Sequence, residues 1–245
     1  SVTAITETKV ENSKPQVKAN EVSPSFNQNE YKFVKEGLVN YKKFYVNKTN
    51  STWAERRFEE WSKLKNGNVQ FKSENDAQEF LNPFWSQMSD QWWNKEFVEE
   101  LKSVLPDNSA KQIMVWNPGC GKGMETYCLA CLLKDRYPMA KIKIYAQDND
   151  LLAIANAPMI KVPQNASSSW LSKHLTKNAA GNLVFSPEIK ESILFEYHDC
   201  KNSNTLPMVD IVFCRDLLCL FDETSSSQLV KDFEETLKGN GVIVL

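Results

Sequence analysis

Three glycines at alternate positions, Gly119, Gly121 and Gly123, are the strongest chemical signal in the sequence. They follow the apolar run 113–116 and precede a stretch, 124–136, with apolar residues at helical spacing. Glycine lets a backbone turn sharply and approach a ligand closely. The spacing fits neither the P-loop nor the dinucleotide fingerprint. It suits a nucleoside without phosphates such as S-adenosylmethionine (SAM), and the alternative is a glycine turn in an ordinary α/β domain.

A second apolar run, 142–146, leads to Asp148, which lies 25 residues beyond Gly123. A carboxylate can accept hydrogen bonds from both hydroxyls of a ribose, and nucleotide sites place an acid near this distance. Strand, glycine turn, helix, strand and terminal acid together form one nucleotide-binding half of a Rossmann-like sheet. The pattern therefore predicts an α/β fold.

Two further strands are expected over 193–197 and 209–213, and polar residues follow each of them. Ligands in open α/β sheets bind outside the carboxyl ends of the strands. A helix is expected from about 224 to 237, closed by Gly239, and residues 242–245 begin one more strand. These elements extend the sheet around the same edge.

Three separated motifs resemble the chemotaxis receptor methyltransferases (CheR-like proteins). Members of this family use SAM to make glutamate methyl esters on bacterial chemoreceptors. The resemblance covers roughly 75–245 and rests on Trp116-(x2)-Gly119-Cys120-(x2)-Gly123-x-Glu125-x-Tyr127-x-Leu129-Ala130, Ala146-x-Asp148-x-Asp150 and Phe213-Cys214-Arg215-(x5)-Phe221-Asp222. It implies a Rossmann-like SAM-dependent methyltransferase fold with an N-terminal helical subdomain and a small β insertion.

The resemblance also implies a site for SAM or its product S-adenosylhomocysteine (SAH). Asp148 stands where the family's acid holds the ribose, and Asp199 replaces an asparagine near the adenine. Asp216 likewise replaces an asparagine. The full set of expected cofactor-binding residues is Asn82, Gly119, Gly121, Gly123, Glu125, Asp148, Asp199, Cys200, Arg215 and Asp216.

The part of the family pattern that orients the methyl acceptor is altered. Ser86 stands where the family has an arginine, and Leu220 stands where it has a tyrosine. An arginine fork and a tyrosine hydroxyl can hold a carboxylate in line with the methyl group. We therefore expect no intact catalytic residue and a structural or regulatory module. The alternatives are an active receptor-glutamate methyltransferase and a methyltransferase for another acceptor.

Composition narrows the partners. The 29 basic and 31 acidic residues nearly balance, so nucleic acid is not the expected partner. No apolar stretch approaches the length of a membrane span, which predicts a cytoplasmic protein without membrane insertion. Six cysteines lie on expected helices and strands, which predicts that they are buried thiols. Because the chain has only two histidines, no metal site is expected.

The chain divides into three regions. Residues 1–28 read as a disordered linker, which hints at another domain upstream. Residues 29–106 form the expected helical subdomain, and 107–245 form the α/β domain with 156–193 as a small insertion. The resemblance implies chemoreceptors or chemotaxis coupling proteins as partners, in or near chemoreceptor arrays. A homodimer is also expected, because an edge strand would remain open.

Overall fold

The structure is a computed structural model that describes residues 26–86, 88–163, 165–166 and 169–245. These residues form two compact units. The helical unit comprises 26–85 and 218–227, and the α/β unit comprises 86–217 and 228–245. The boundary after residue 85 differs from the expected one at 106, because apolar residues of 93–105 pack in the core of the α/β unit. The expected linker lies outside the described residues as far as residue 25.

Three helices make most of the helical unit: α1 (Gln28–Lys42), α2 (Ser51–Leu64) and α3 (Glu74–Leu81). Ser73 caps α3 as predicted, and Asp76 completes a capping box with it. The core between the helices is largely aromatic. It includes Tyr31, Phe44, Phe58, Trp61 and Phe80. Edge-to-face ring contacts fix these helices to one another.

A short segment from much later in the chain completes the helical unit. The buried Asn47 donates from Nδ2 to the carbonyl oxygens of Leu218 at 2.9 Å and Phe221 at 3.0 Å. The turn η4 (Leu218–Leu220) is held by these bonds. Burying the Asn47 amide without hydrogen-bond acceptors would cost free energy, so these two bonds favour this particular position of η4.

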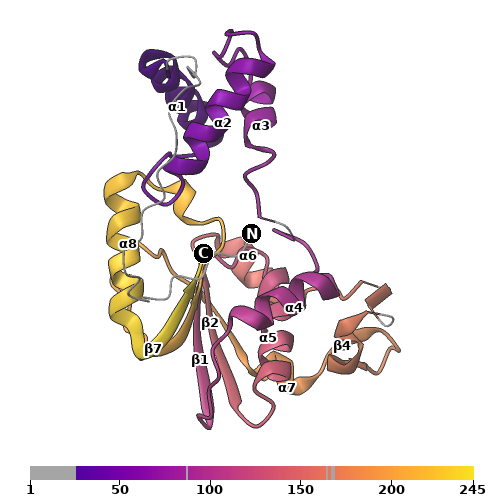
Figure 1. Cartoon of the computed structure of the whole chain (residues 1–245). Coiled ribbons are helices and arrows are strands. Elements are labelled where there is room, and N and C mark those ends of the chain that lie inside the picture. The colour runs from indigo at the N-terminus through magenta and orange to yellow at the C-terminus, as the bar shows by residue number, and fades with distance from the viewer. Residues whose placement is uncertain (1–25, 87, 164, 167–168) are drawn as a thin grey trace. The chain divides into compact units, whose positions relative to one another are not determined.

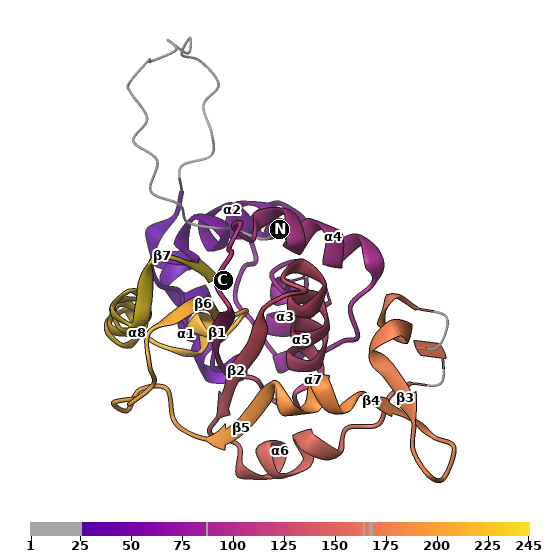
Figure 2. The same cartoon turned by 90° about the horizontal axis from the view of Figure 1, so that it is seen from below.

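The α/β unit is built on a five-stranded sheet in the order β5-β2-β1-β6-β7 (Figure 2). Every pairing in it is parallel. The strands are β1 (Gln112–Pro118), β2 (Lys141–Asp148), β5 (Ile193–Tyr197), β6 (Val209–Phe213) and β7 (Leu237–Val244). The predicted strands are confirmed, and so is the Rossmann-like fold class.

One boundary near the C-terminus was wrong. Helix α8 (Glu223–Thr236) ends before Leu237, which was expected inside the helix and instead begins β7. Lys238 donates from Nζ to the buried Asp210 carboxylate at 2.7 Å, and the β6–β7 register shifts beside that residue. Leu237 pairs with Val209 of β6, and sequence spacing alone does not indicate this pairing.

Helix α5 (Met124–Arg136) occupies the residues predicted for it and is buried on nearly every side. It packs with α4 (Lys95–Val104) and α7 (Pro187–Glu191) on one face of the sheet, and Figure 1 shows α4 and α5 beside β1 and β2. Alternate residues of β1 point to opposite faces. Val115 joins the core with α5, whereas Trp116 packs edge-on against Phe233, 5.1 Å between ring centroids.

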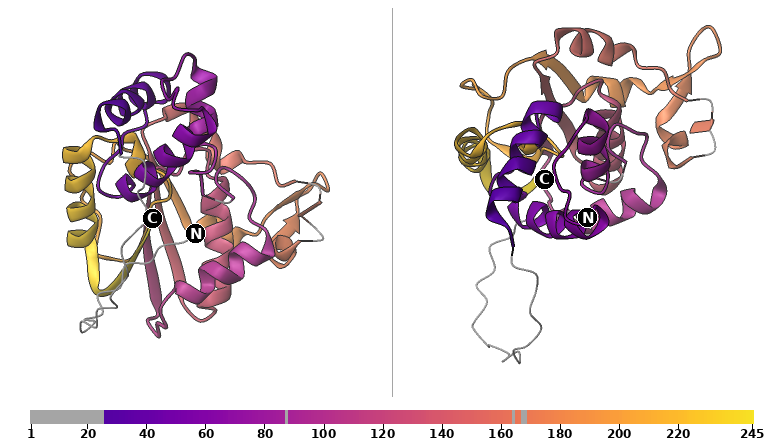
Figure 3. Two further views of the ribbon diagram at one scale, coloured as in Figure 1. Left: turned by 45° about the horizontal axis from the view of Figure 1, so that its top comes forward. Right: turned by 90° about the horizontal axis from the view of Figure 1, so that it is seen from above.

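The insertion follows α6 (Leu151–Asn156) and the turn η1 (Ala157–Met159). It contains η3 (Trp170–His174) and the antiparallel pair β3 (Leu175–Lys177) and β4 (Leu183–Phe185). Figure 3 shows this small sheet standing apart from the five-stranded one. Phe185 stacks on Tyr127 of α5 with ring centroids 4.4 Å apart, which ties the insertion to the main core.

Two further observations bear on composition. No helix in the described part of the chain has the length and apolar character needed to cross a bilayer. All six cysteines are free thiols, and only Cys200 is not fully buried.

Candidate functional site

The glycine turn joins β1 to α5 at the carboxyl edge of the sheet. Gly119, Gly121 and Gly123 all have positive φ, at 69°, 53° and 81°. A Cβ on Gly123 would lie 2.9 Å from the Phe195 ring, so only glycine fits there. A Cβ on Gly121 would meet no heavy atom of the described residues within 4 Å. An added Cβ at the middle of the loop would therefore contact none of the described residues.

Asp148 lies directly against this loop. Its Oδ2 accepts a hydrogen bond from the Gly121 N–H at 2.8 Å, and its Oδ1 accepts one from the Asp150 N–H at 2.8 Å. The charge also acts on the neighbouring thiol. Burial, assisted by the Asp148 charge, raises the pKa of Cys120 to about 12. The structure thus joins the glycine turn and the terminal acid that the sequence singled out.

Gln147, which the sequence reading missed, connects three parts of this edge. Its carbonyl oxygen accepts from the Cys120 N–H at 3.1 Å. Its side-chain Oε1 accepts from Trp116 Nε1 at 2.9 Å and from Asn204 Nδ2 at 2.7 Å. Its Nε2 donates to Glu196 Oε2 at 3.2 Å. In the sequence it is marked only as a polar residue that directly follows the apolar run 142–146.

Asp199 and Cys200 follow β5 at the same edge. Asp199 Oδ1 accepts from the Lys201 N–H at 3.0 Å, and its carbonyl accepts from the Asn202 N–H at 2.9 Å. The pKa of the half-buried Cys200 is raised to about 11, mainly by burial and then by the Asp199 charge. These bonds form a tight turn that places both residues next to the end of β2.

The carboxyl end of β6 carries Arg215 and Asp216. Arg215 Nη1 forms an ion pair with Glu125 in the first turn of α5, and its guanidinium lies 4.8 Å from the centre of the Phe97 ring. Glu125 also accepts from the Asp90 N–H at 3.0 Å and from Trp93 Nε1 at 3.4 Å. Even so, the pKa of Glu125 is raised, because burial outweighs the nearby Arg215 charge.

Asp216 is held by two hydroxyl groups. Ser86 Oγ and Ser89 Oγ each donate to its carboxylate at 2.8 Å. Asp216 has φ of 54°, the left-handed region that asparagine and aspartate enter more readily than most residues. Ser89 was not singled out from the sequence, because it belongs to no motif.

Two expected residues belong to the helical unit. Asn82 follows α3, and its Oδ1 accepts from Gln78 Nε2 at 2.9 Å on an exposed surface. Leu220 closes η4 and is 44% exposed. The α/β unit therefore gathers the other expected residues by itself.

A separate cavity of about 450 Å³ lies between α5, α7 and the start of β2. Lys134, Met139, Lys141, Glu188 and Glu191 line its rim. The start of β2 is the amino edge of the sheet, so this cavity is at the opposite end from the glycine turn. Within the described residues, no group of three or more His, Cys, Asp or Glu could hold a metal ion.

Comparisons with known proteins give a consistent result. Residues 87–245 match the family described as "CheR methyltransferase, SAM binding domain", and residues 23–80 match the "CheW-CheR linker domain". The chain is 28% identical over 162 residues to chemotaxis protein methyltransferase 2 of Vibrio cholerae, covering 62% of this chain and 56% of that one. It is 26% identical over 151 residues to the chemotaxis protein methyltransferase of Listeria monocytogenes, covering 59% and 57%.

The chain spans just over half the length of these curated relatives. Among solved structures, a SAM-dependent methyltransferase from Thiobacillus denitrificans in complex with SAH is 15% identical, with a TM-score of 0.40. That similarity covers 64% of this chain and 50% of the other.

Proposed function

Because the chain belongs to the CheR methyltransferase family through its SAM-binding domain, we propose that it is a chemotaxis module that binds SAM or SAH but transfers methyl groups poorly. The observation that carries this proposal is the hydrogen bond between Ser86 and Asp216. Both residues differ from the family pattern, and each satisfies the other. The module then acts in regulation or assembly.

The arrangement of the residues expected to contact the cofactor supports binding of SAM or SAH. Asp148 is fixed against Gly121 with a carboxylate oxygen 2.8 Å from the loop N–H, and no described heavy atom lies within 4 Å of the position that a Cβ on Gly121 would take. In this proposal Asp148 accepts the ribose hydroxyls, while Asp199 and Cys200 contact the adenine. Arg215, Asp216 and Glu125 border the amino-acid end of the cofactor.

The residues at the positions that orient the methyl acceptor in the family support weak catalysis. In glutamate methylation a carboxylate oxygen attacks the sulfonium methyl in line, and no proton has to move, so the rate depends on positioning. Ser86 carries no charge, and Leu220 has no hydrogen-bonding group. Each lost hydrogen bond to a charged group costs roughly 1.5–3 kcal/mol. Two such losses lower the rate by roughly two to four orders of magnitude.

The second candidate is an active protein-glutamate O-methyltransferase of chemoreceptors. The observation that favours it is the intact series of glycines, Asp148 and Arg215 in a chain of this family. In this case another group orients the acceptor carboxylate in place of Ser86 and Leu220.

The match of residues 23–80 to the CheW-CheR linker domain supports chemotaxis partners. We propose that the partner is a chemoreceptor or a coupling protein, in cytoplasmic arrays, and that two copies of the chain associate. Light scattering at increasing concentration, together with binding to a receptor fragment, tests this part of the proposal. A strictly monomeric protein that binds neither partner would contradict it.

Two measurements on the full chain test the proposed function. Calorimetric titration should detect SAM or SAH binding, and labelled-methyl incorporation into a receptor fragment should fall at least tenfold below that of an ordinary family member. A rate within tenfold of that member would overturn weak catalysis and favour the second candidate. The double variant Ser86→Arg with Leu220→Tyr then asks whether positioning was the missing ingredient, and partial recovery supports that explanation.

A further inference from the structure

The cavity between α5, α7 and the start of β2 has an apolar floor. It encloses about 450 Å³ and lies at the amino edge of the sheet, away from the glycine turn. Small side chains of α5 and of the turn before β2 leave the hollow, and branched side chains of β2 and α7 complete it. These floor residues are all buried: Ala130, Ala140, Ile142 and Ile189. Such a floor favours an apolar side chain as its occupant, because burial of apolar surface is favourable.

The rim of the cavity carries charges of both signs. Lys134 Nζ and Glu188 Oε1 form an ion pair at 2.6 Å. Lys141 and Glu191 are exposed, and their side chains form no ion pair with any residue that the structure describes. The rim therefore offers one unpaired positive charge and one unpaired negative charge to whatever covers the cavity.

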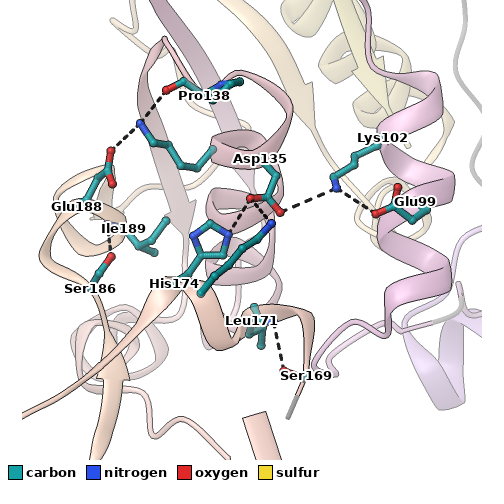
Figure 4. Close-up of polar contacts among 12 residues, drawn as sticks. Glu99, Lys102, Asp135, Pro138, Ser169, Leu171, His174, Ser186, Glu188 and Ile189 are labelled. Atoms are coloured by element: carbon teal, nitrogen blue, oxygen red, sulfur yellow. Dashed lines mark hydrogen bonds and ion pairs between the residues drawn. The ribbon is translucent and has the colours of Figure 1, made fainter. Parts of the chain in front are cut away.

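Met139 lines the same cavity and is 94% exposed. It is the third residue of a turn that is closed by a hydrogen bond of 3.0 Å from the Ala140 N–H to the Tyr137 carbonyl oxygen. Tyr137 is buried, and Lys134 Nζ donates to the Pro138 carbonyl oxygen at 3.2 Å (Figure 4). The turn thus presents an apolar side chain on a backbone that is already ordered, so binding costs little additional backbone entropy.

We propose that two copies of this chain associate through this surface, with Met139 of each copy inserted into the cavity of the other. In a two-fold contact the same patch meets itself, so each group needs its complement on the same patch. This surface meets that requirement, because an exposed apolar side chain adjoins an apolar hollow and an unpaired lysine accompanies an unpaired glutamate. Lys141 of each copy then faces Glu191 of the other. The inference rests on the association of two copies in the proposed function and assigns a surface to it, at the edge of the sheet opposite the glycine turn.

Sedimentation velocity on the full chain over a series of concentrations tests the apolar contact. The wild type should form a dimer, and Met139→Asp should raise its dissociation constant roughly tenfold or more, because a charged side chain cannot enter an apolar cavity without losing its hydration. The matched control is Leu152→Asp on α6, which gives the same charge to another apolar residue that is 72% exposed. It should leave the dissociation constant unchanged, because α6 follows β2 at the carboxyl edge of the sheet. Equal effects of the two changes would overturn the inference.

Charge reversal tests the two-fold arrangement more sharply. Lys141→Glu and Glu191→Lys should each raise the dissociation constant of their own dimer roughly tenfold or more, because each change brings like charges together twice. In a mixture of the two variants, one chain carries glutamate at both positions and the other carries lysine at both, so both contacts are attractive. The mixture should therefore form heterodimers with nearly the affinity of the wild-type dimer. A mixture as monomeric as its separate components would overturn the pairing of Lys141 with Glu191.

The same experiments distinguish failure of this surface from failure of the proposed function. A dimeric wild type that is insensitive to Met139→Asp and to both charge reversals would overturn the surface and leave the association of two copies intact. A wild type that stays monomeric at every concentration would overturn both. SAM and SAH binding is measured separately by titration calorimetry, so neither outcome alters that part of the proposed function.

Discussion

Ser86 donates a hydrogen bond of 2.8 Å to the carboxylate of Asp216, 130 positions further along the chain. In the family pattern these positions hold an arginine and an asparagine. The two differences are therefore linked in space, and Ser89 adds a second donor at the same distance. A site in which two altered residues satisfy each other can be structurally stable without the groups that orient an acceptor.

Removing one of these donors should destabilise the fold measurably. A hydrogen bond to a charged group contributes roughly 1.5–3 kcal/mol, and partial exposure puts Ser86→Ala near the lower limit. Urea unfolding measures this loss. Ser227→Ala is the matched control, because the Ser227 hydroxyl donates to the exposed Glu223 carboxylate. That change should cost less than about 0.5 kcal/mol. Equal losses of stability in Ser86→Ala and Ser227→Ala would mean that the hydrogen bond to Asp216 contributes no more than an exposed one.

Gln147 belongs to no motif, but we expect its side chain to contribute to the free energy of unfolding. Gln147→Leu leaves the buried Trp116 N–H and the Asn204 amide without their acceptor. Leaving a buried donor unsatisfied costs about 1–3 kcal/mol, so we expect a loss of free energy of unfolding in this range. Hydrogen exchange should also increase over 199–204, the turn after β5.

The control for this change is Gln78→Leu in the helical unit, whose amide makes an exposed hydrogen bond to Asn82. We expect that variant to change the free energy of unfolding by less than about 0.5 kcal/mol. If Gln147→Leu were equally mild, the side chain would be a bystander, and the loop after β5 would be held by other contacts.

His174 should make the stability of the α/β unit depend on pH. Its Nε2 lies 3.0 Å from Asp135 Oδ1, in a cluster that joins the insertion to α5 (Figure 4). Burial lowers the pKa of His174 below its ordinary value of 6.5, although the Asp135 charge opposes this shift. The charged groups around it are Asp135, Lys173, Lys102, Glu99 and Glu188.

The direction of the pH dependence follows from the linkage between protonation of His174 and folding. A histidine with a lowered pKa in the folded state contributes stability above pH 6.5, and this contribution is lost as the pH falls through the folded pKa. The wild-type protein should therefore lose more stability than His174→Gln between about pH 7 and 5. Thermal unfolding across that range measures the difference. Parallel curves for the two proteins would show that His174 does not titrate on unfolding.

Much of the fold could be predicted because its signals are local. The residues of α5, β5 and β6 were identified from apolar spacing and flanking polar residues, and the Ser73 cap from its position before an apolar-periodic run. The start of β7 was missed because it is set by the pairing of Leu237 with Val209, which is distant in sequence.

The residues of the candidate site also divide into those with a local sequence signal and those that depend on contacts distant in sequence. Gly121 and Asp148 were identifiable because the glycine spacing and the strand-terminal acid each have a chemical meaning on their own. Ser89 and Gln147 were not, because their roles arise from partners on other elements. The partnership of Ser86 with Asp216 was also invisible, since each residue alone reads only as a departure from the family pattern.

The last prediction separates strain in the glycine turn from its use in binding. Gly121 and Gly181 both have positive φ, at 53° and 78°, and a Cβ on either would meet no described heavy atom within 4 Å. Gly121→Ala and Gly181→Ala should therefore each cost about 1–2 kcal/mol of stability, because alanine is strained in this conformation. Only Gly121 lies beside Asp148 at the sheet edge, and Gly181 lies in the turn between β3 and β4. Gly121→Ala should weaken SAM binding at least tenfold by calorimetry, because the added methyl group fills the space where the ligand approaches the loop. Gly181→Ala should leave the affinity unchanged. If both variants bound SAM as the wild type does, the open side of Gly121 would not be the cofactor site, even if the stability losses matched.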